Sequence, residues 1–160
     1  MLTFGGMRFA RGPLTAGQRV VLENGVGHLH RAAQVPPGVD LAGVSAAVYA
    51  LVCRHEALRT RFPGGGREQV VDGAGMLTLR MCGDVAEARA AVTTDPFDIV
   101  GEWGIRVGVV CEGGVPLAVV LCMSQLAVDA QEASQLADEL CALLRGAEPH
   151  GQPLRPLDKV

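Results

Sequence analysis

The chain has 160 residues, of which 49% are hydrophobic and 19% are charged, and its formal net charge is −3 at pH 7. This composition predicts one domain with a substantial core and excludes an intrinsically disordered chain. The small negative charge gives no attraction toward nucleic acid or an anionic membrane, and no apolar run reaches the ~18 residues that a membrane helix needs.

The chain contains 5 cysteines, and no two of them have CxxC spacing. An odd number without metal-ligand spacing predicts neither a disulfide framework nor a zinc site. The segment Met1–Gly6 lacks the charged and apolar regions of a signal peptide. We therefore expect a reduced, cytoplasmic protein without a bound metal.

The first part of the chain predicts two strands and two helices. Residues 7–11 are expected to form a short strand. Thr15, with Gln18 three residues later, is typical of a capping box and predicts the start of a helix. The segment His28–Val35 alternates loosely and ends at two prolines, which favours a strand. Asp40 can cap a second helix, because apolar residues follow it at spacings of three and four.

Strand signals dominate the middle of the chain. Arg67–Val71 and Met76–Cys82 are predicted to form a pair of strands around a glycine-containing turn. Asp84 can cap a short helix after them. The runs 105–111 and 116–123 give the strongest strand signals. The second run is apolar on both faces, as a central strand covered on two sides would be.

Helical spacing returns at residues 131–144, and a proline-containing tail or linker is expected at 149–160. We therefore predict a single lobe over residues 1–148. The pattern of strands and helices predicts an α/β protein, a mixed sheet with helices packed on it.

The histidines outside the specific motifs are predicted to be surface residues. His28 and His30 would share one face of their strand, and a solvated face is expected because no third metal ligand follows at a sensible spacing. His150 lies in the tail and is expected to be exposed. Trp103, the only tryptophan, is expected to pack in the core.

The run Arg54–Phe62, RHEALRTRF, is the most specific pattern in the chain. It resembles the RHExLRTxF signature of nonribosomal peptide synthetase condensation domains. Pro13–Arg19 is similar to the PLSxxQxR opening of that family, and Asp95–Ile99 looks like its PFDL segment. Pro116–Leu144 is similar to the strand, loop and helix around its active-site motif, HHxxxDG. The resemblance implies a chloramphenicol-acetyltransferase-like fold, and only the N-terminal one of the two lobes that whole condensation domains contain.

The active-site motif is degenerate. Ser124 and Gln125 stand at the two histidine positions of HHxxxDG, Asp129 keeps the aspartate position, and Ala130 replaces the glycine. In the family the second histidine assists amine attack on a thioester, and the aspartate forms a structural ion pair with an arginine. The resemblance therefore implies an ion pair between Arg59 and Asp129.

We expect no catalytic residue at this motif. A glutamine amide cannot accept a proton near pH 7 as an imidazole can. General bases contribute roughly 10²–10⁴-fold to rates, so most amide-forming activity should be absent. The second family motif is expected to be structural, and it comprises Arg54, His55, Glu56, Leu58, Arg59 and Phe62.

Two functions follow from the resemblance. The first is a non-catalytic protein-interaction or recruitment module in a nonribosomal peptide or hybrid polyketide–peptide assembly line. Its expected partners are a carrier protein, a tailoring enzyme, a second-lobe polypeptide or another copy of the chain. No bound cofactor is expected, although a carrier protein would bring its own phosphopantetheine arm.

The second function is one half of a split or truncated acyl or peptidyl transferase, which forms amide or ester bonds from carrier-bound thioesters. A structural or regulatory protein outside any assembly line is the third alternative. The sequence leaves all three open.

Overall fold

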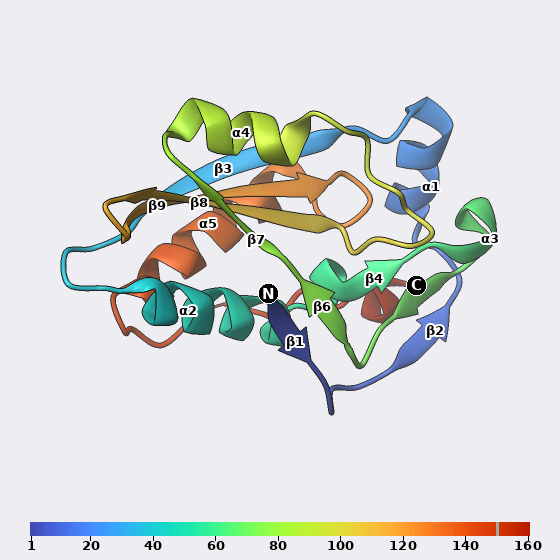
Figure 1. Cartoon of the computed structure of the whole chain (residues 1–160). Helices are drawn as coiled ribbons and strands as arrows, with labels where there is room; N and C mark the ends of the chain where they lie inside the picture. Colours follow the sequence, from blue (N-terminus) through green and yellow to red (C-terminus); the bar gives the residue numbers. More distant parts are fainter. Residues whose placement is uncertain (150) are drawn as a thin grey trace.

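A four-stranded mixed sheet lies at the centre of the computed structural model, which describes residues 1–149 and 151–160 (Figure 1). Its spatial order is β3 (His28–Gln34), β9 (Val115–Ser124), β8 (Ile105–Glu112) and β7 (Leu79–Cys82). Strands β3 and β8 both run antiparallel to β9, and β7 runs parallel to β8. The predicted mixed sheet is therefore confirmed.

Helices cover both faces of this sheet (Figure 1). Helix α4 (Val85–Thr93) packs on one face, where it contacts β7, β8 and β9. Helices α2 (Leu41–Arg54) and α5 (Ala130–Leu144) pack against each other on the opposite face. The arrangement is a three-layer α/β structure, and it confirms the predicted mixed sheet with helices packed on it.

Strand β9 is buried on both faces, which confirms its predicted central position. Leu121 and Met123 belong to the core under α2 and α5, whereas Val120 and Cys122 belong to the cluster under α4. Side chains alternate between the two faces of a strand, so a strand between two helical layers needs apolar residues at every position.

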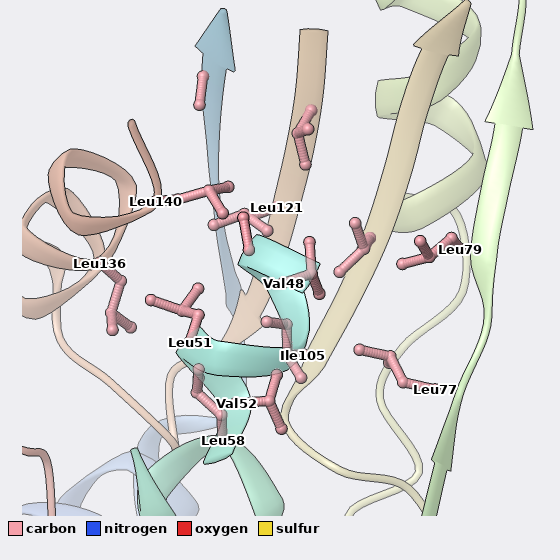
Figure 2. Close-up of a cluster of buried hydrophobic side chains, with 14 of the residues drawn as sticks. Val48, Leu51, Val52, Leu58, Leu77, Leu79, Ile105, Leu121, Leu136 and Leu140 are labelled. Carbon is pink, nitrogen blue, oxygen red and sulfur yellow. The ribbon is translucent and has the colours of Figure 1, made fainter. Parts of the chain in front are cut away.

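The larger core joins the sheet to α2 and α5, and Figure 2 shows its side chains meeting between these elements. Leu51 of α2 and Leu140 of α5 are completely buried there. Truncation of such a leucine to alanine costs roughly 2–5 kcal/mol. Trp103 lies in the same core and is 8% exposed, as we expected. The core residues labelled in the figure are Val48, Leu51, Val52, Leu58, Leu77, Leu79, Ile105, Leu121, Leu136 and Leu140.

Two smaller sheets and several short helices complete the lobe. The three-stranded sheet has the order β2 (Ala10–Gly12), β5 (Gln69–Val71) and β4 (Thr60–Arg61), and the two-stranded sheet pairs β1 (Leu2–Phe4) with β6 (Gly75–Leu77). The remaining helical segments are α1 (Ala16–Asn24), η1 (Glu56–Arg59), α3 (Pro63–Gly66) and η2 (Pro156–Lys159). In the part of the chain that the structure describes, every helix is too short or too polar to cross a membrane.

The predicted pairing of Arg67–Val71 with Met76–Cys82 is wrong. Strand β5 already has a neighbour on each edge, because Val71 lies opposite Ala10 of β2 and Thr60 of β4. The second run divides after Leu77: its first part, β6, pairs with β1, and its second part, β7, joins the large sheet. The strand expected at residues 7–11 begins later, at Ala10, and β1 was not predicted.

The helix starts agree with the predicted caps. The Thr15 hydroxyl accepts a hydrogen bond from Gln18 N at 3.1 Å, and the Gln18 side chain accepts one from Thr15 N at 2.9 Å. Asp40 caps α2 and Asp84 caps α4 through single hydrogen bonds of 2.8 Å to backbone N–H groups. These contacts satisfy N–H groups that have no partner within the helix.

Candidate functional site

The loop between β9 and α5 contains the degenerate motif, and backbone hydrogen bonds hold it in place. Ser124 N donates to Gly104 O at 2.9 Å, while Ser124 O accepts from Ala127 N at 2.9 Å and from Val128 N at 3.2 Å. The buried Ser124 hydroxyl accepts a hydrogen bond from Leu126 N at 3.2 Å. Ser124 therefore caps the turn that follows its strand.

Gln125 takes part in a reciprocal contact with Gly27, which precedes β3. Gln125 N donates to Gly27 O at 3.0 Å, and Gly27 N donates to Gln125 Oε1 at 3.1 Å. A Cβ at Gly27 would lie 2.8 Å from Gln125 Oε1, so a larger residue at this position would displace the Gln125 amide. The amide oxygen that stands in the place of the histidine is thus engaged in holding two loops together.

The expected ion pair between Arg59 and Asp129 is wrong. Asp129 is exposed and caps α5: its carboxylate accepts a hydrogen bond from Glu132 N at 2.8 Å, and Glu132 Oε1 accepts one from Asp129 N at 3.0 Å. Over residues 1–149 and 151–160, no hydrogen bond or ion pair joins Asp129 to Arg59. The local capping box uses the carboxylate that the family pattern assigned to an arginine.

Arg59 is instead a buried clamp on backbone carbonyls. It is 3% exposed, and its guanidinium donates to the carbonyls of Val52, Cys53, Arg8 and Asp72 at 2.8–3.3 Å. It therefore connects the end of α2 to the N-terminal segment and to the end of β5. Burial lowers the pKa of Arg59, because the charged form loses hydration.

The first two residues of the second family motif, Arg54 and His55, both contact Glu139 of α5. Arg54 forms an ion pair with the buried Glu139, and His55 Nε2 contacts the other carboxylate oxygen. His55 Nδ1 accepts a hydrogen bond from Leu154 N at 3.0 Å, so the ring proton of neutral His55 is on Nε2 and is donated to Glu139. Burial lowers the pKa of His55, although Glu139 opposes this effect. Both ring nitrogens are occupied, so His55 is not free to act as a base.

The remaining motif residues are structural in the described geometry. Glu56 is buried and binds the guanidinium of Arg8 through two hydrogen bonds of 2.6 and 2.8 Å. Leu58 is completely buried, and Phe62 packs in a small cluster with Leu126 of the degenerate loop. The motif therefore ties together α2, α5, the N-terminus and the tail.

Sequence reasoning missed two residues that complete this network, Arg8 and Glu139. Glu139 carried a usable signal, because a glutamate beside Leu136 and Leu140 on the apolar stripe of a helix needs a buried partner. Arg8 carried no such signal, since it lies in an irregular segment and only the tertiary structure brings it to Glu56.

The degenerate loop lines a cleft with a volume of about 350 Å³. The beginning of α1 and residues 154–159 of the tail form its other sides. Its charged groups include Glu132, which pairs with Lys159 at 3.2 Å, and neither a histidine nor a cysteine is among the residues that line it. The cleft is large enough for a ligand but lacks the imidazole that the family motif supplies.

Other candidate chemical groups do not line this cleft. His28 lies opposite Ser124 in the β3–β9 ladder, but His28 and His30 are both exposed on β3 and neither lines the cleft. His150 lies outside the described residues. Burial raises the pKa of Cys122 to about 11, so this thiol stays protonated near pH 7. Within the described ranges, no three His, Cys, Asp or Glu side chains are grouped in a way that could hold a metal ion.

Comparisons with known proteins identify relatives of one kind, although no protein-family profile matches the chain. The chain is 34% identical over 129 residues to cyclosporin synthetase simA of Tolypocladium inflatum, a match that covers 71% of this chain and 1% of the synthetase. The chain therefore spans a very small part of the length of this curated relative.

Solved structures with the same fold extend this likeness. One is the complex of the X-domain and OxyB from teicoplanin biosynthesis, with a TM-score of 0.70, 23% identity, and coverage of 94% of this chain and 36% of that one. Another is the condensation domain from the monacolin K polyketide synthase MokA, with a TM-score of 0.69, 18% identity, and coverage of 94% and 38%. Matches to little more than a third of each structure correspond to one of two lobes. The chain is thus similar over a single lobe to the condensation domains of nonribosomal peptide synthetases and polyketide synthases, and it has their chloramphenicol-acetyltransferase-like fold.

Proposed function

We propose that this lobe is a non-catalytic interaction or recruitment module of a nonribosomal peptide or hybrid polyketide–peptide assembly line. The observation that carries the proposal is the state of Gln125, which replaces the histidine of the motif and uses its amide oxygen to bind Gly27 N at 3.1 Å. A glutamine in this position can hold a loop or orient a ligand, but it cannot take a proton from an attacking amine.

The histidines support the same proposal. His28 and His30 are solvent-exposed on β3, and His55 is buried and bound at both ring nitrogens. No imidazole from the described part of the chain lines the cleft beside the degenerate loop. Catalysis at this loop would therefore depend on positioning and electrostatics alone.

A precedent for recruitment comes from a protein of the same fold, the X-domain of teicoplanin biosynthesis, which forms a complex with OxyB. By analogy we propose an enzyme or a carrier protein of the same assembly line as the partner of this chain. A second-lobe polypeptide or another copy of the chain would be detected by the same binding measurement.

Two measurements on the purified chain test this proposal. The first is titration calorimetry with the purified carrier proteins and modifying enzymes encoded beside it, and we expect a saturable complex with at least one of them. The second is a thioester aminolysis assay, in which we expect no turnover above the uncatalysed rate. Turnover by the wild-type chain would instead support the split acyltransferase, and the absence of any complex would reject the recruitment role.

Gln125→His provides the matched variant for the aminolysis assay. An imidazole at this position restores a proton acceptor but loses the amide oxygen that binds Gly27 N. We expect this variant to remain inactive, because the exchange also breaks the contact with Gly27 that holds the loop. A gain of roughly 10²-fold or more, the usual contribution of a general base, would show that the catalytic surroundings are intact.

A further inference from the structure

A second cleft, which shares Arg155 with the cleft beside the degenerate loop, is lined largely by arginines. Its volume is about 280 Å³, and Arg8, Arg54, Arg59 and Arg155 line it together with the single carboxylate Glu56. The residues come from the N-terminal segment, the end of α2, η1 and the tail, so only the folded chain brings these charges together. We propose that this cleft binds a phosphate-type oxyanion.

The charges at the cleft do not cancel. Arg54 is paired with Glu139 and Arg8 with Glu56. Arg59 donates only to backbone carbonyls, and the side chain of Arg155 makes no hydrogen bond or ion pair over the described ranges. Two guanidinium charges are therefore left without a carboxylate partner.

Nearby carboxylates do not remove this excess. Glu56 is the carboxylate that acts most strongly on Arg59, but Arg8 binds it through two hydrogen bonds of 2.6 and 2.8 Å. Asp72 acts on Arg59 more weakly and is bound by Arg61 through two hydrogen bonds of 2.6 and 3.0 Å. Asp158 acts on Arg8 electrostatically but is exposed, so solvent screens it. The excess of positive charge is concentrated around a group that is 3% exposed, Arg59, where electrostatic interactions are stronger than in water.

Two of these arginines also have N–H donors without an acceptor in the part of the chain that the structure describes. Arg8 binds Glu56 through Nε and Nη2, which leaves its Nη1 group without an acceptor among the described contacts. The whole guanidinium of Arg155 is also uncommitted in those contacts. Guanidinium groups bind phosphate oxygens through paired N–H donors, and a phosphate monoester carries a charge of about −1.5 to −2 near pH 7. The charge and the donors of the cleft thus match a phosphate dianion better than a carboxylate.

An NMR titration of the isotope-labelled chain with inorganic phosphate tests the site. The side-chain Nε–Hε signals of the arginines are followed at constant ionic strength. We expect saturable shifts at Arg8 and Arg59. Arg155→Gln should weaken binding about tenfold, the effect of losing one charge-assisted hydrogen bond. Arg155 is exposed, so this substitution leaves the core intact. Arg89→Gln removes the same charge from α4 on the opposite face of the sheet and should leave the affinity unchanged.

The anion could be free phosphate or a phosphoryl group that is esterified to a larger molecule. A parallel titration with phenyl phosphate distinguishes these two sources. Affinity equal to or above that of inorganic phosphate indicates an esterified phosphoryl group, and clearly weaker binding indicates free phosphate. The proposal is overturned if sodium chloride alone produces the same shifts, or if Arg155→Gln and Arg89→Gln weaken phosphate binding equally. Neither outcome bears on recruitment, which is measured with protein partners.

Discussion

Asp129 offers a sharp test of whether the family ion pair or the observed helix cap stabilises this lobe. Its carboxylate is exposed and accepts a hydrogen bond from Glu132 N at 2.8 Å, at the first turn of α5. Asparagine caps helices about as well as aspartate, so Asp129→Asn should lose only the interaction with the helix dipole, about 0.3–1 kcal/mol. Asp129→Ala also removes the cap and should cost about 1 kcal/mol, within a range of roughly 0.5–2 kcal/mol.

An ion pair with Arg59 would give a different pattern. Removal of one partner from a buried pair costs roughly 3–5 kcal/mol, and asparagine would lose the charge as completely as alanine does. The free energy of unfolding can be measured in urea by the fluorescence of Trp103, the single tryptophan, which is 8% exposed in the folded state.

Asp84 is the matched control, since it is also exposed and caps α4 through a hydrogen bond of 2.8 Å to Glu87 N. The Asn and Ala substitutions at Asp84 should show the same small, ordered losses as those at Asp129. A loss of about 3 kcal/mol or more for Asp129→Asn, with little loss for Asp84→Asn, would refute the capping explanation.

Three further perturbations address the buried network and the turn before β6. Arg59→Met should lower the free energy of unfolding by about 3–5 kcal/mol, because several buried carbonyls lose a charged donor; urea unfolding measures it. Gly73→Ala should cost about 1–3 kcal/mol, because its Cβ would lie 2.5 Å from Met7 O. Burial lowers the pKa of His55, so its contribution to stability is present above the unfolded pKa of about 6.5 and is lost as the pH falls below it. The free energy of unfolding of His55→Gln should therefore depend less on pH below this value than that of the wild type. His30→Gln is the control, because the pKa of this exposed histidine is also lowered.

Controls separate these effects from the general cost of substitution. Gly5→Ala introduces the same methyl group where no atom lies within 4 Å, so it should be close to neutral. Arg89→Met removes an exposed arginine from α4 and should change the free energy of unfolding by less than about 0.5 kcal/mol. Equal losses for Arg59→Met and Arg89→Met would contradict the role of Arg59 as a clamp.

The degenerate motif could be identified from the sequence, but the contacts of its residues could not. Gln125 was recognisable as the replacement of a histidine, because the surrounding pattern is continuous along the chain. Its bond to Gly27 joins residues 98 positions apart and has no local signal. The same holds for Glu56 and Arg8, which are 48 positions apart. The part of the site that depends on chain connectivity was therefore predictable, and the part that depends on packing was not.

What the sequence determined by itself is the presence of helices α1, α2, α4 and α5 with the caps of the first three, the central strands β8 and β9, and the absence of both motif histidines. A cap such as Thr15 with Gln18 is decided within four residues, and a strand such as β9 shows in its own apolar run that both faces are covered. Tertiary structure alone decided which edges pair and which charges meet. Strand β5 pairs with β2 and β4 and not with the nearby β6, and Asp129 caps its own helix instead of pairing with Arg59. Groups that are distant in the sequence compete for the same hydrogen-bonding partners, and only the complete fold determines which of them is within reach.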